Sequence, residues 1–140
     1  MIFRKLEEND YEKYLPLIKD FRDTDFTEDE FRNNLNIIKK YSDIWVIEID
    51  SQLICTGTII YESKYIYNMC KAGHIEDICT KLEYRGKGYG KEMIHFLINE
   101  AKKNKCYKVN LVCSKENSLF YKKCGMEERG VHMAYLISKS

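Results

Sequence analysis

The sequence predicts a single α/β domain built on a mixed sheet, and three observations support this fold class. Strand-like and helix-like segments follow one another in the order β-α-α-β-β-β-α-β-α-β along 140 residues. One long strand-like segment leads directly into a glycine-rich turn and an amphipathic helix, a pattern that favours helices packed on a sheet. No linker, repeat or low-complexity stretch divides the chain, so we expect one domain over residues 1–140.

Runs rich in apolar and β-branched residues predict the strands. These segments are Ile2–Leu6, Ile44–Ile49, Gln52–Tyr61, Ala72–Thr80, Tyr107–Cys113 and Arg129–Ile137. Residues 50–51 form the turn of a hairpin, and the shape of the tyrosine-rich connection 62–71 is left open.

Capping residues and apolar spacing predict the helices. Asn9 or Asp10 is expected to cap a first helix that ends at Phe21, with Pro16 near its first turn. Thr27 forms a capping box with the glutamate three residues later and begins a second helix.

The two remaining helices follow the glycine-rich turn and the last but one strand. An apolar stripe that starts at Met93 and Ile94 predicts a helix to about Lys103. Asn117 is expected to cap a short helix, Ser118–Cys124, that ends before a glycine.

The composition is that of an ordinary globular protein. The net charge is +1, which argues against general nucleic-acid binding, because such binding rests on neutralising several phosphates. No apolar run reaches the length of a membrane span, and the three histidines show no metal-ligand spacing. The six cysteines form no CxxC pair, and we expect them to be free thiols in a reducing compartment, the cytoplasm.

The stretch Arg85-Gly86-Lys87-Gly88-Tyr89-Gly90-Lys91 predicts an anion site. Unpaired N–H groups and the helix dipole favour negative charge at the start of the helix that follows. Neither common phosphate loop fits, because no Ser or Thr follows Lys91 and the glycines lack the dinucleotide spacing. The alternative is an ordinary turn before the helix, with Arg85, Lys87 and Lys91 as solvated charges or as a nucleic-acid patch.

Glu76 and Asp77 lie in an otherwise apolar strand. Such carboxylates are costly in a sheet unless they are paired or face a cleft, and neighbours on a regular strand point to opposite faces. We expect a functional cleft here, with a bulge that redirects one side chain. The alternative pairs them with Lys71, Arg85 or Lys108.

Four motifs in one order resemble the glucosamine-6-phosphate N-acetyltransferases of the GNAT superfamily. They are Gly73-His74-Ile75-Glu76-Asp77-Ile78, Tyr84-Arg85-Gly86-x-Gly88-x-Gly90-Lys91, Cys106-Tyr107-Lys108 and Asn117-x-x-Phe120-Tyr121-x-Lys123-Cys124-Gly125. The resemblance covers essentially the whole chain. It implies a GNAT fold, with a mixed, mostly antiparallel sheet and helices on both faces. It also implies a homodimer that acetylates glucosamine 6-phosphate with acetyl-CoA, towards UDP-N-acetylglucosamine, without a metal.

The resemblance also implies roles for individual residues. Tyr121 would protonate the leaving thiolate, and Glu76 and Asp77 would meet the amine or hydroxyls of the sugar. Lys108, Arg22 and Arg129 are the candidates for the sugar phosphate. The residues expected to bind coenzyme A are Ile78, Cys79, Thr80, Arg85, Gly86, Lys87, Gly88, Tyr89, Gly90, Lys91, Asn117 and Tyr121.

Several alternatives stay open. The family carries an acid where this chain has Val112, so Glu76, Asp77 or a water must assist the amine instead. The acceptor could be another amine, on a polyamine, an antibiotic or a protein, or the chain could be a non-catalytic acetyl-CoA-binding module. Tyr121 could be a half-buried structural tyrosine, and Cys79 is the candidate for a covalent route, although no base is paired with it.

Overall fold

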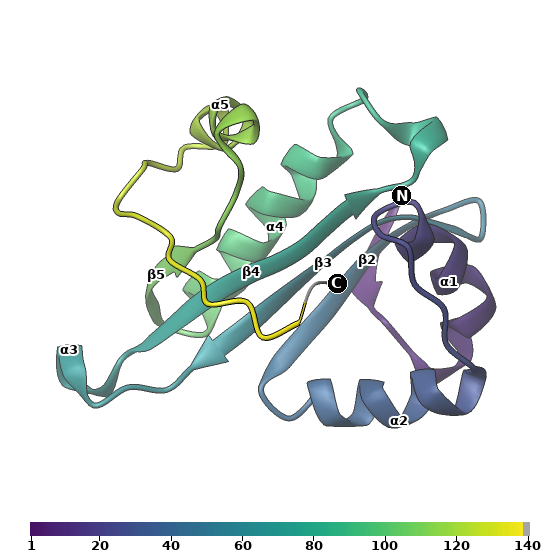
Figure 1. Cartoon of the computed structure of the whole chain (residues 1–140), viewed down its shortest axis with the longest axis horizontal. Coiled ribbons are helices and arrows are strands. Elements are labelled where there is room, and N and C mark those ends of the chain that lie inside the picture. The colour runs from purple at the N-terminus through teal and green to yellow at the C-terminus, as the bar shows by residue number, and fades with distance from the viewer. Residues whose placement is uncertain (139–140) are drawn as a thin grey trace.

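A five-stranded sheet is the centre of the computed structural model, which describes residues 1–138 (Figure 1). The strands lie across the sheet in chain order: β1 (Ile2–Lys5), β2 (Ser42–Ile49), β3 (Gln52–Glu62), β4 (Lys71–Thr80) and β5 (Cys106–Asn110). Neighbours from β1 to β4 are antiparallel, and β5 runs parallel to β4. The predicted mixed, mostly antiparallel sheet is therefore confirmed.

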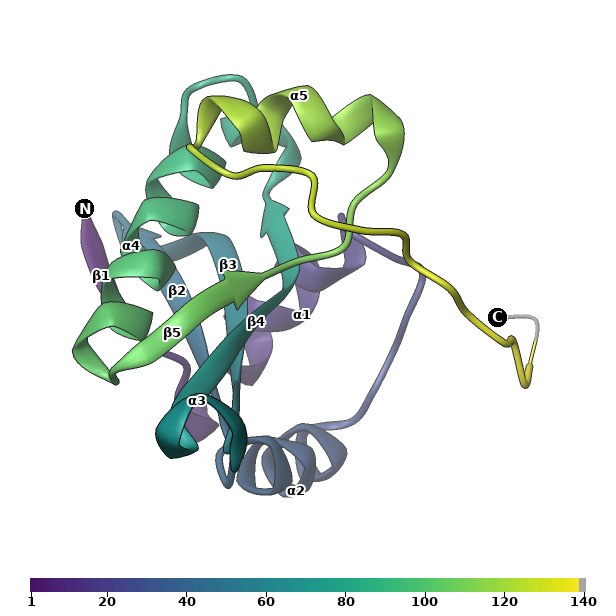
Figure 2. The ribbon, with the colours of Figure 1, turned by 90° about the vertical axis from the view of Figure 1, so that its left-hand side faces the viewer.

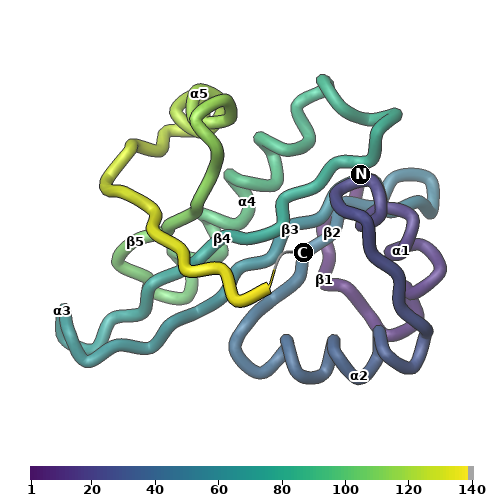
Figure 3. The backbone as a smooth tube through the Cα atoms, in the orientation of Figure 1, coloured from purple at the N-terminus to yellow at the C-terminus, as the bar shows by residue number. Residues whose placement is uncertain are grey.

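Helices cover both faces of this sheet, as predicted. The helices are α1 (Tyr11–Lys19), α2 (Glu28–Ile38), α3 (Ile66–Met69), α4 (Tyr89–Lys103) and α5 (Lys115–Lys123), with 3-10 turns at Glu8–Asp10 and Leu82–Tyr84. α1 and α2 lie on the opposite side of the sheet from α4, and α5 stands beside α4 (Figures 2 and 3).

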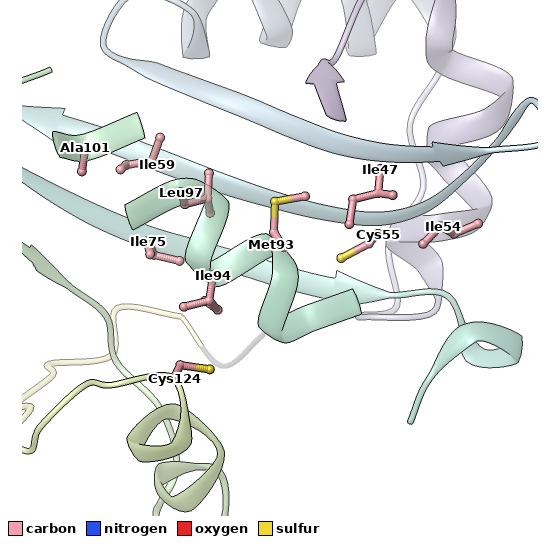
Figure 4. Close-up of a cluster of buried hydrophobic side chains, with 10 residues drawn as sticks. All are labelled: Ile47, Ile54, Cys55, Ile59, Ile75, Met93, Ile94, Leu97, Ala101 and Cys124. Atoms are coloured by element: carbon pink, nitrogen blue, oxygen red, sulfur yellow. The ribbon is translucent and has the colours of Figure 1, made fainter. Parts of the chain in front are cut away.

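The alternation of side chains along the strands fills two cores at once. Ile47 packs with Met93 and Leu97 of α4 on one face (Figure 4). Its neighbour Val46 packs on the other face with residues of α1 and α2, including Leu17. Both strand residues are fully buried, so β2 is fixed in register by apolar contacts on its two sides.

The predicted helix starts are confirmed at α2, confirmed in position only at α1, and wrong at α5. α1 has Asp10 at its N-cap without a side-chain cap, ends at Lys19 instead of Phe21, and contains Pro16 in its interior. The capping box of α2 is present, because Glu30 N–H donates to Thr27 Oγ1 at 3.2 Å and Thr27 N–H donates to the Glu30 carboxylate at 2.9 Å. Asp10 precedes α1, but its buried carboxylate accepts hydrogen bonds from Arg4 at 2.8 and 2.9 Å. Asn117 does not cap α5. The helix starts earlier, after Ser114, and Asn117 lies in its first turn.

The predicted last strand, Arg129–Ile137, is wrong. The structure has no regular element between α5 and residue 138, and this segment extends away from the domain (Figure 2). Val131, Tyr135 and Ile137 are each at least 90% exposed. The β-branched and aromatic pattern of the segment suits a strand, but a strand needs a partner, and the segment pairs with none of the five strands described.

The connection between β3 and β4 forms an exposed apolar tip. Tyr67, Asn68 and Met69 all have left-handed backbones, with φ between 55° and 63°, a conformation that costs such residues roughly 1–2 kcal/mol each. Tyr65 and Met69 are 93% and 69% exposed. The tip is tied to the domain by Tyr67, whose ring centre lies 4.4 Å from that of Tyr107 on β5, while the other apolar side chains of the tip remain exposed.

The cysteines are all free thiols, and Cys55, Cys79 and Cys124 are buried. No helix within residues 1–138 has the length and apolar character needed to cross a membrane. Across the same residues, no group of three or more metal-ligating side chains comes together.

Gly57 of β3 lies close against Ile78 of β4 and against α4. A Cβ at this position would lie 2.6 Å from Ile78 Cδ1 and 2.9 Å from Met93 Cγ. Gly57→Ala should therefore lower the free energy of unfolding by about 1–3 kcal/mol, the usual cost of overpacking a core. Urea denaturation measures this, with Gly130→Ala as the control, since nothing lies within 4 Å of a Cβ there. Equal midpoints for the two variants would contradict the close packing.

Candidate active site

β4 and β5 are paired only along the first part of β4. They pair only from Lys71 opposite Cys106 to His74 opposite Asn110, and β4 then continues past the end of β5 towards α5 (Figure 2). The second half of β4 is paired with β3 on one side and has no neighbouring strand on the other. Its outward backbone groups are therefore free to pair with an extended ligand.

A bulge interrupts β4 in this open half, as the sequence predicted. Thr58 pairs with Glu76 and Thr56 pairs with Cys79, so two residues of β4 lie opposite Gly57 alone. Asp77, the first of the two, has a left-handed backbone with φ 53°. The bulge breaks the alternation of faces, and both Glu76 and Asp77 are exposed.

Neither carboxylate has an ionic partner within residues 1–138. The alternative pairing with Lys71, Arg85 or Lys108 is not formed there. Their exposure and their lack of partners leave both groups available to a cationic or hydroxylated ligand, and their catalytic role stays a prediction.

The glycine loop turns the chain from β4 into α4. Gly86 and Gly88 have φ of 78° and 90°, which glycine adopts without strain. Gly88 is the N-cap of α4, and the first helical bond runs from Glu92 N–H to its carbonyl at 3.0 Å. The amides of residues 89–91 therefore have no partner in the helix, and they form the positive end of a 15-residue helix.

A pocket of about 430 Å³ joins the open half of β4 to this helix start. It is lined by Phe21, Ile78, Cys79, Thr80, Tyr84, Arg85, Gly86, Gly88, Tyr89, Gly90, Lys91, Asn117, Phe120 and Tyr121. The structure thus brings together every predicted coenzyme-binding residue except Lys87, whose ammonium lies 5.4 Å from the ring centre of Tyr84. Sequence reasoning missed Phe21, Tyr84 and Phe120 as lining residues.

Tyr121 supplies the phenol of this pocket. Burial raises its pKa above the ordinary value of 10.0, and the nearby Cys113 and Cys124 thiols raise it further. The hydroxyl therefore keeps its proton at neutral pH. Its ring packs edge-on against Phe120 and joins the core beneath α4, so the phenol is held in place, and its role as a proton donor stays a prediction.

Cys79 also lines the pocket, but its thiol is buried. Burial raises its pKa, and its sulfur donates to the carbonyl of Leu17 at 3.4 Å. A thiol that is protonated and committed to a carbonyl is a poor nucleophile, which disfavours the covalent alternative.

Arg85 is already engaged by the protein. Its Nε donates to the Thr80 carbonyl at 2.9 Å and its Nη2 donates to the Asp20 carbonyl at 3.0 Å. Lys87 and Lys91, the other cations of the loop, form no ion pair in the part of the chain that the structure describes. Coenzyme binding by all three stays a prediction.

The three candidates for a sugar phosphate do not come together. The Arg22 guanidinium lies 4.4 Å from the ring centre of Phe21, a residue that lines the pocket. Lys108 lies on β5 over Tyr107, and Arg129 is paired with Glu127 at 3.4 Å in the exposed C-terminal segment. None of them lines the pocket, and their common role stays a prediction.

Comparison with known proteins identifies the family. A model of the acetyltransferase (GNAT) domain matches residues 40–128. Glucosamine 6-phosphate N-acetyltransferase of Arabidopsis thaliana is 38% identical over 138 residues, which cover 94% of this chain and 93% of that protein. The chain belongs to this family of GNAT acetyltransferases. A Dictyostelium discoideum relative of the same name is 37% identical, with 94% and 88% covered.

Solved structures agree with this family assignment. The crystal structure of the Arabidopsis thaliana enzyme superposes with a TM-score of 0.91 at 36% identity and covers 98% of each chain. A Clostridium acetobutylicum acetyltransferase crystallised with acetyl-CoA has the same fold, with a TM-score of 0.73 at 24% identity and 97% and 96% covered.

Val112 departs from the acid expected in this family at its position. It is 56% exposed in the loop after β5. An apolar side chain cannot take a proton, and assistance to the amine by Glu76 or Asp77 of the β4 bulge stays a prediction.

Proposed function

We propose that the protein transfers the acetyl group of acetyl-CoA to the amine of glucosamine 6-phosphate. The product is N-acetylglucosamine 6-phosphate, a precursor of UDP-N-acetylglucosamine. One observation carries the proposal: the open edge of β4, the N-terminus of α4 and the phenol of Tyr121 line a single pocket. The similarity to named glucosamine 6-phosphate N-acetyltransferases supports the choice of sugar.

The pocket suits the three chemical parts of coenzyme A. Free amides at the start of α4, with Lys87 and Lys91, suit its phosphates. The backbone of Ile78 to Thr80 suits the amides of the pantetheine arm, which would pair with it as an added strand. The apolar rings of Phe21 and Phe120 suit the intervening carbon chain.

Glu76 and Asp77 are the residues that orient the amine in this proposal. Their carboxylates attract the ammonium form of the sugar and accept its proton, directly or through a water. The neutral amine then attacks the acetyl carbonyl, and a backbone N–H of the β4 bulge stabilises the oxyanion. Because the amine is itself the nucleophile, no covalent enzyme intermediate is required.

Tyr121 completes the reaction as the general acid. It gives its phenolic proton to the thiolate that leaves, and its raised pKa keeps that proton available at neutral pH. We place the enzyme in the cytoplasm as part of the same proposal, since its six free cysteines suit a reducing compartment.

The choice of acceptor is tested by release of free coenzyme A. Glucosamine 6-phosphate should yield free thiol, and glucosamine should not, because the phosphate supplies the binding charge. A panel of polyamines, aminoglycosides and peptide amines is assayed beside them. Faster release with one of those amines would move the chain to the alternative acetyltransferase function. Coenzyme binding without turnover of any amine would identify a non-catalytic module.

Tyr121→Phe isolates the general acid. The change removes one hydroxyl and keeps the ring, so packing against Phe120 and coenzyme binding should persist. General acid catalysis is worth about 10²–10⁴-fold, so kcat should fall by that factor while KM for acetyl-CoA changes little. Tyr41→Phe is the matched control, since Tyr41 is 74% exposed and lies outside the pocket. A kcat within about threefold of the parent would exclude the role.

We also propose that the protein is a homodimer. The C-terminal segment 129–138 is apolar and exposed, and the tip at residues 65–69 adds further exposed aromatic surface. Apolar surface of this extent marks a protein interface. A second copy would supply the strand edge that residues 131–137 lack, and the acceptor site would lie near the boundary of the subunits.

Sedimentation equilibrium tests the dimer. The expected mass is twice the 16.7 kDa of one chain. Ile137→Asp should shift the equilibrium towards the monomer, because a charge replaces a side chain that is 95% exposed in one copy. Ile37→Asp is the control, since Ile37 is a 61% exposed isoleucine on α2. A fully active monomer at assay concentrations would refute the proposal.

A further inference from the structure

Arg85 and Asp20 close a ring of hydrogen bonds at one end of the pocket. The Arg85 guanidinium bridges the carbonyls of Thr80, at the end of β4, and of Asp20, which follows α1. The Asp20 carboxylate in turn accepts the backbone N–H of Leu82 at 3.1 Å. These bonds join the end of α1 to the segment that leads into the glycine loop.

Phe21 is the residue next to this ring of hydrogen bonds. It follows Asp20 directly, lines the pocket and packs against the core beneath α1 and α2. The Arg22 guanidinium lies over the phenyl ring of Phe21, 4.4 Å from its centre, and donates to the Phe21 carbonyl at 2.9 Å. Phe21 thus forms an apolar wall of a pocket that also holds Phe120 and Tyr121.

The two joined segments differ in how firmly they are held. The segment after β4 has its own backbone bonds, from Lys81 N–H to the Ile54 carbonyl at 2.8 Å and from Tyr84 N–H to the Lys81 carbonyl at 2.9 Å. Phe21 and Arg22 are bonded to the last turn of their own helix, where both N–H groups donate to the Ile18 carbonyl at 3.0 and 3.1 Å, and residues 20–27 form no helix or strand. Lys81 is bonded to a different element, β3. If the ring of bonds were broken, Phe21 would therefore move more than the glycine loop.

We propose that Arg85 and Asp20 are positioning residues that hold Phe21 as a wall of the channel for the pantetheine arm. The inference rests on the proposed function, because it assumes that the pocket binds acetyl-CoA. It gives Arg85 a different role from that of a phosphate ligand. The phosphates are left to the free amides of α4 and to Lys87 and Lys91.

The experiment compares two acetyl donors. Acetyl-CoA carries the phosphates, and S-acetylpantetheine has the same thioester and arm without them. Arg85→Lys keeps the charge but cannot span two carbonyls on separate segments, and Asp20→Ala removes the acceptor for Leu82. Both variants should lower kcat/KM about tenfold, as one lost hydrogen bond of about 1.4 kcal/mol would. The loss should be equal with the two donors.

Three further variants make the result specific. Lys87→Ala should lower kcat/KM with acetyl-CoA only, because it removes a charge that acts on phosphate. Asp23→Ala should change neither donor, since Asp23 is an exposed neighbour that forms no hydrogen bond within the described residues. In a Phe21→Ala background, Arg85→Lys should cost less than a further twofold, because the ring of bonds would then have nothing to position.

The outcomes separate the two roles of Arg85. A loss confined to acetyl-CoA, or a full tenfold loss on top of Phe21→Ala, would overturn the positioning role. If a melting curve shows that Asp20→Ala is unfolded, Arg85→Lys carries the test alone, with both donors and in the Phe21→Ala background. A parent protein that uses neither donor would refute the proposed function itself, and the inference with it.

Discussion

The partial pairing of β4 is the constraint on which the site depends. β4 must satisfy its backbone groups against β3 along its length, yet β5 reaches only its first four residues. An open edge of this kind exposes polar backbone groups and invites unwanted pairing. Here α5, the glycine loop and Phe21 surround the opening and reduce it to a pocket. The open edge is then protected from other chains and remains available to a narrow, extended ligand.

The bulge at Asp77 belongs to the same arrangement. A left-handed aspartate costs about 1 kcal/mol or more, and no ion pair within residues 1–138 compensates for it. The strain brings two carboxylates to the surface where a regular strand would turn one of them into a core. It also places Ile78 against Gly57, the residue that leaves room for it. The packing of α4 on β3 and the exposure of the carboxylates therefore rest on one local distortion.

Much of this could be predicted from the sequence because the relevant signals are local. The apolar runs predicted β1 to β4, the spacing of Met93 and Leu97 predicted α4, and Thr27 with Glu30 predicted the start of α2. The pocket walls that come from distant segments could not be predicted. Phe21 meets the glycine loop through a bond from Arg85 to Asp20, 65 residues away in sequence, and no periodicity records such a contact. The prediction of the last strand was wrong for a related reason: residues 129–137 have strand-forming side chains, but the segment pairs with no strand of the sheet, and pairing is a long-range property.

One chain brings together the groups proposed to bind the coenzyme, but not those proposed to bind the acceptor sugar. The coenzyme side has its amides, its open strand edge and its phenol around a single pocket. The acceptor side has two exposed carboxylates, while Arg22, Lys108 and Arg129 lie apart on three different segments. A sugar phosphate needs cations that converge on one point. The chain also ends in an apolar segment that lacks a partner edge. The homodimer proposed above would supply a partner edge for that segment, and a second chain is then the place to look for the cations that one chain does not bring together.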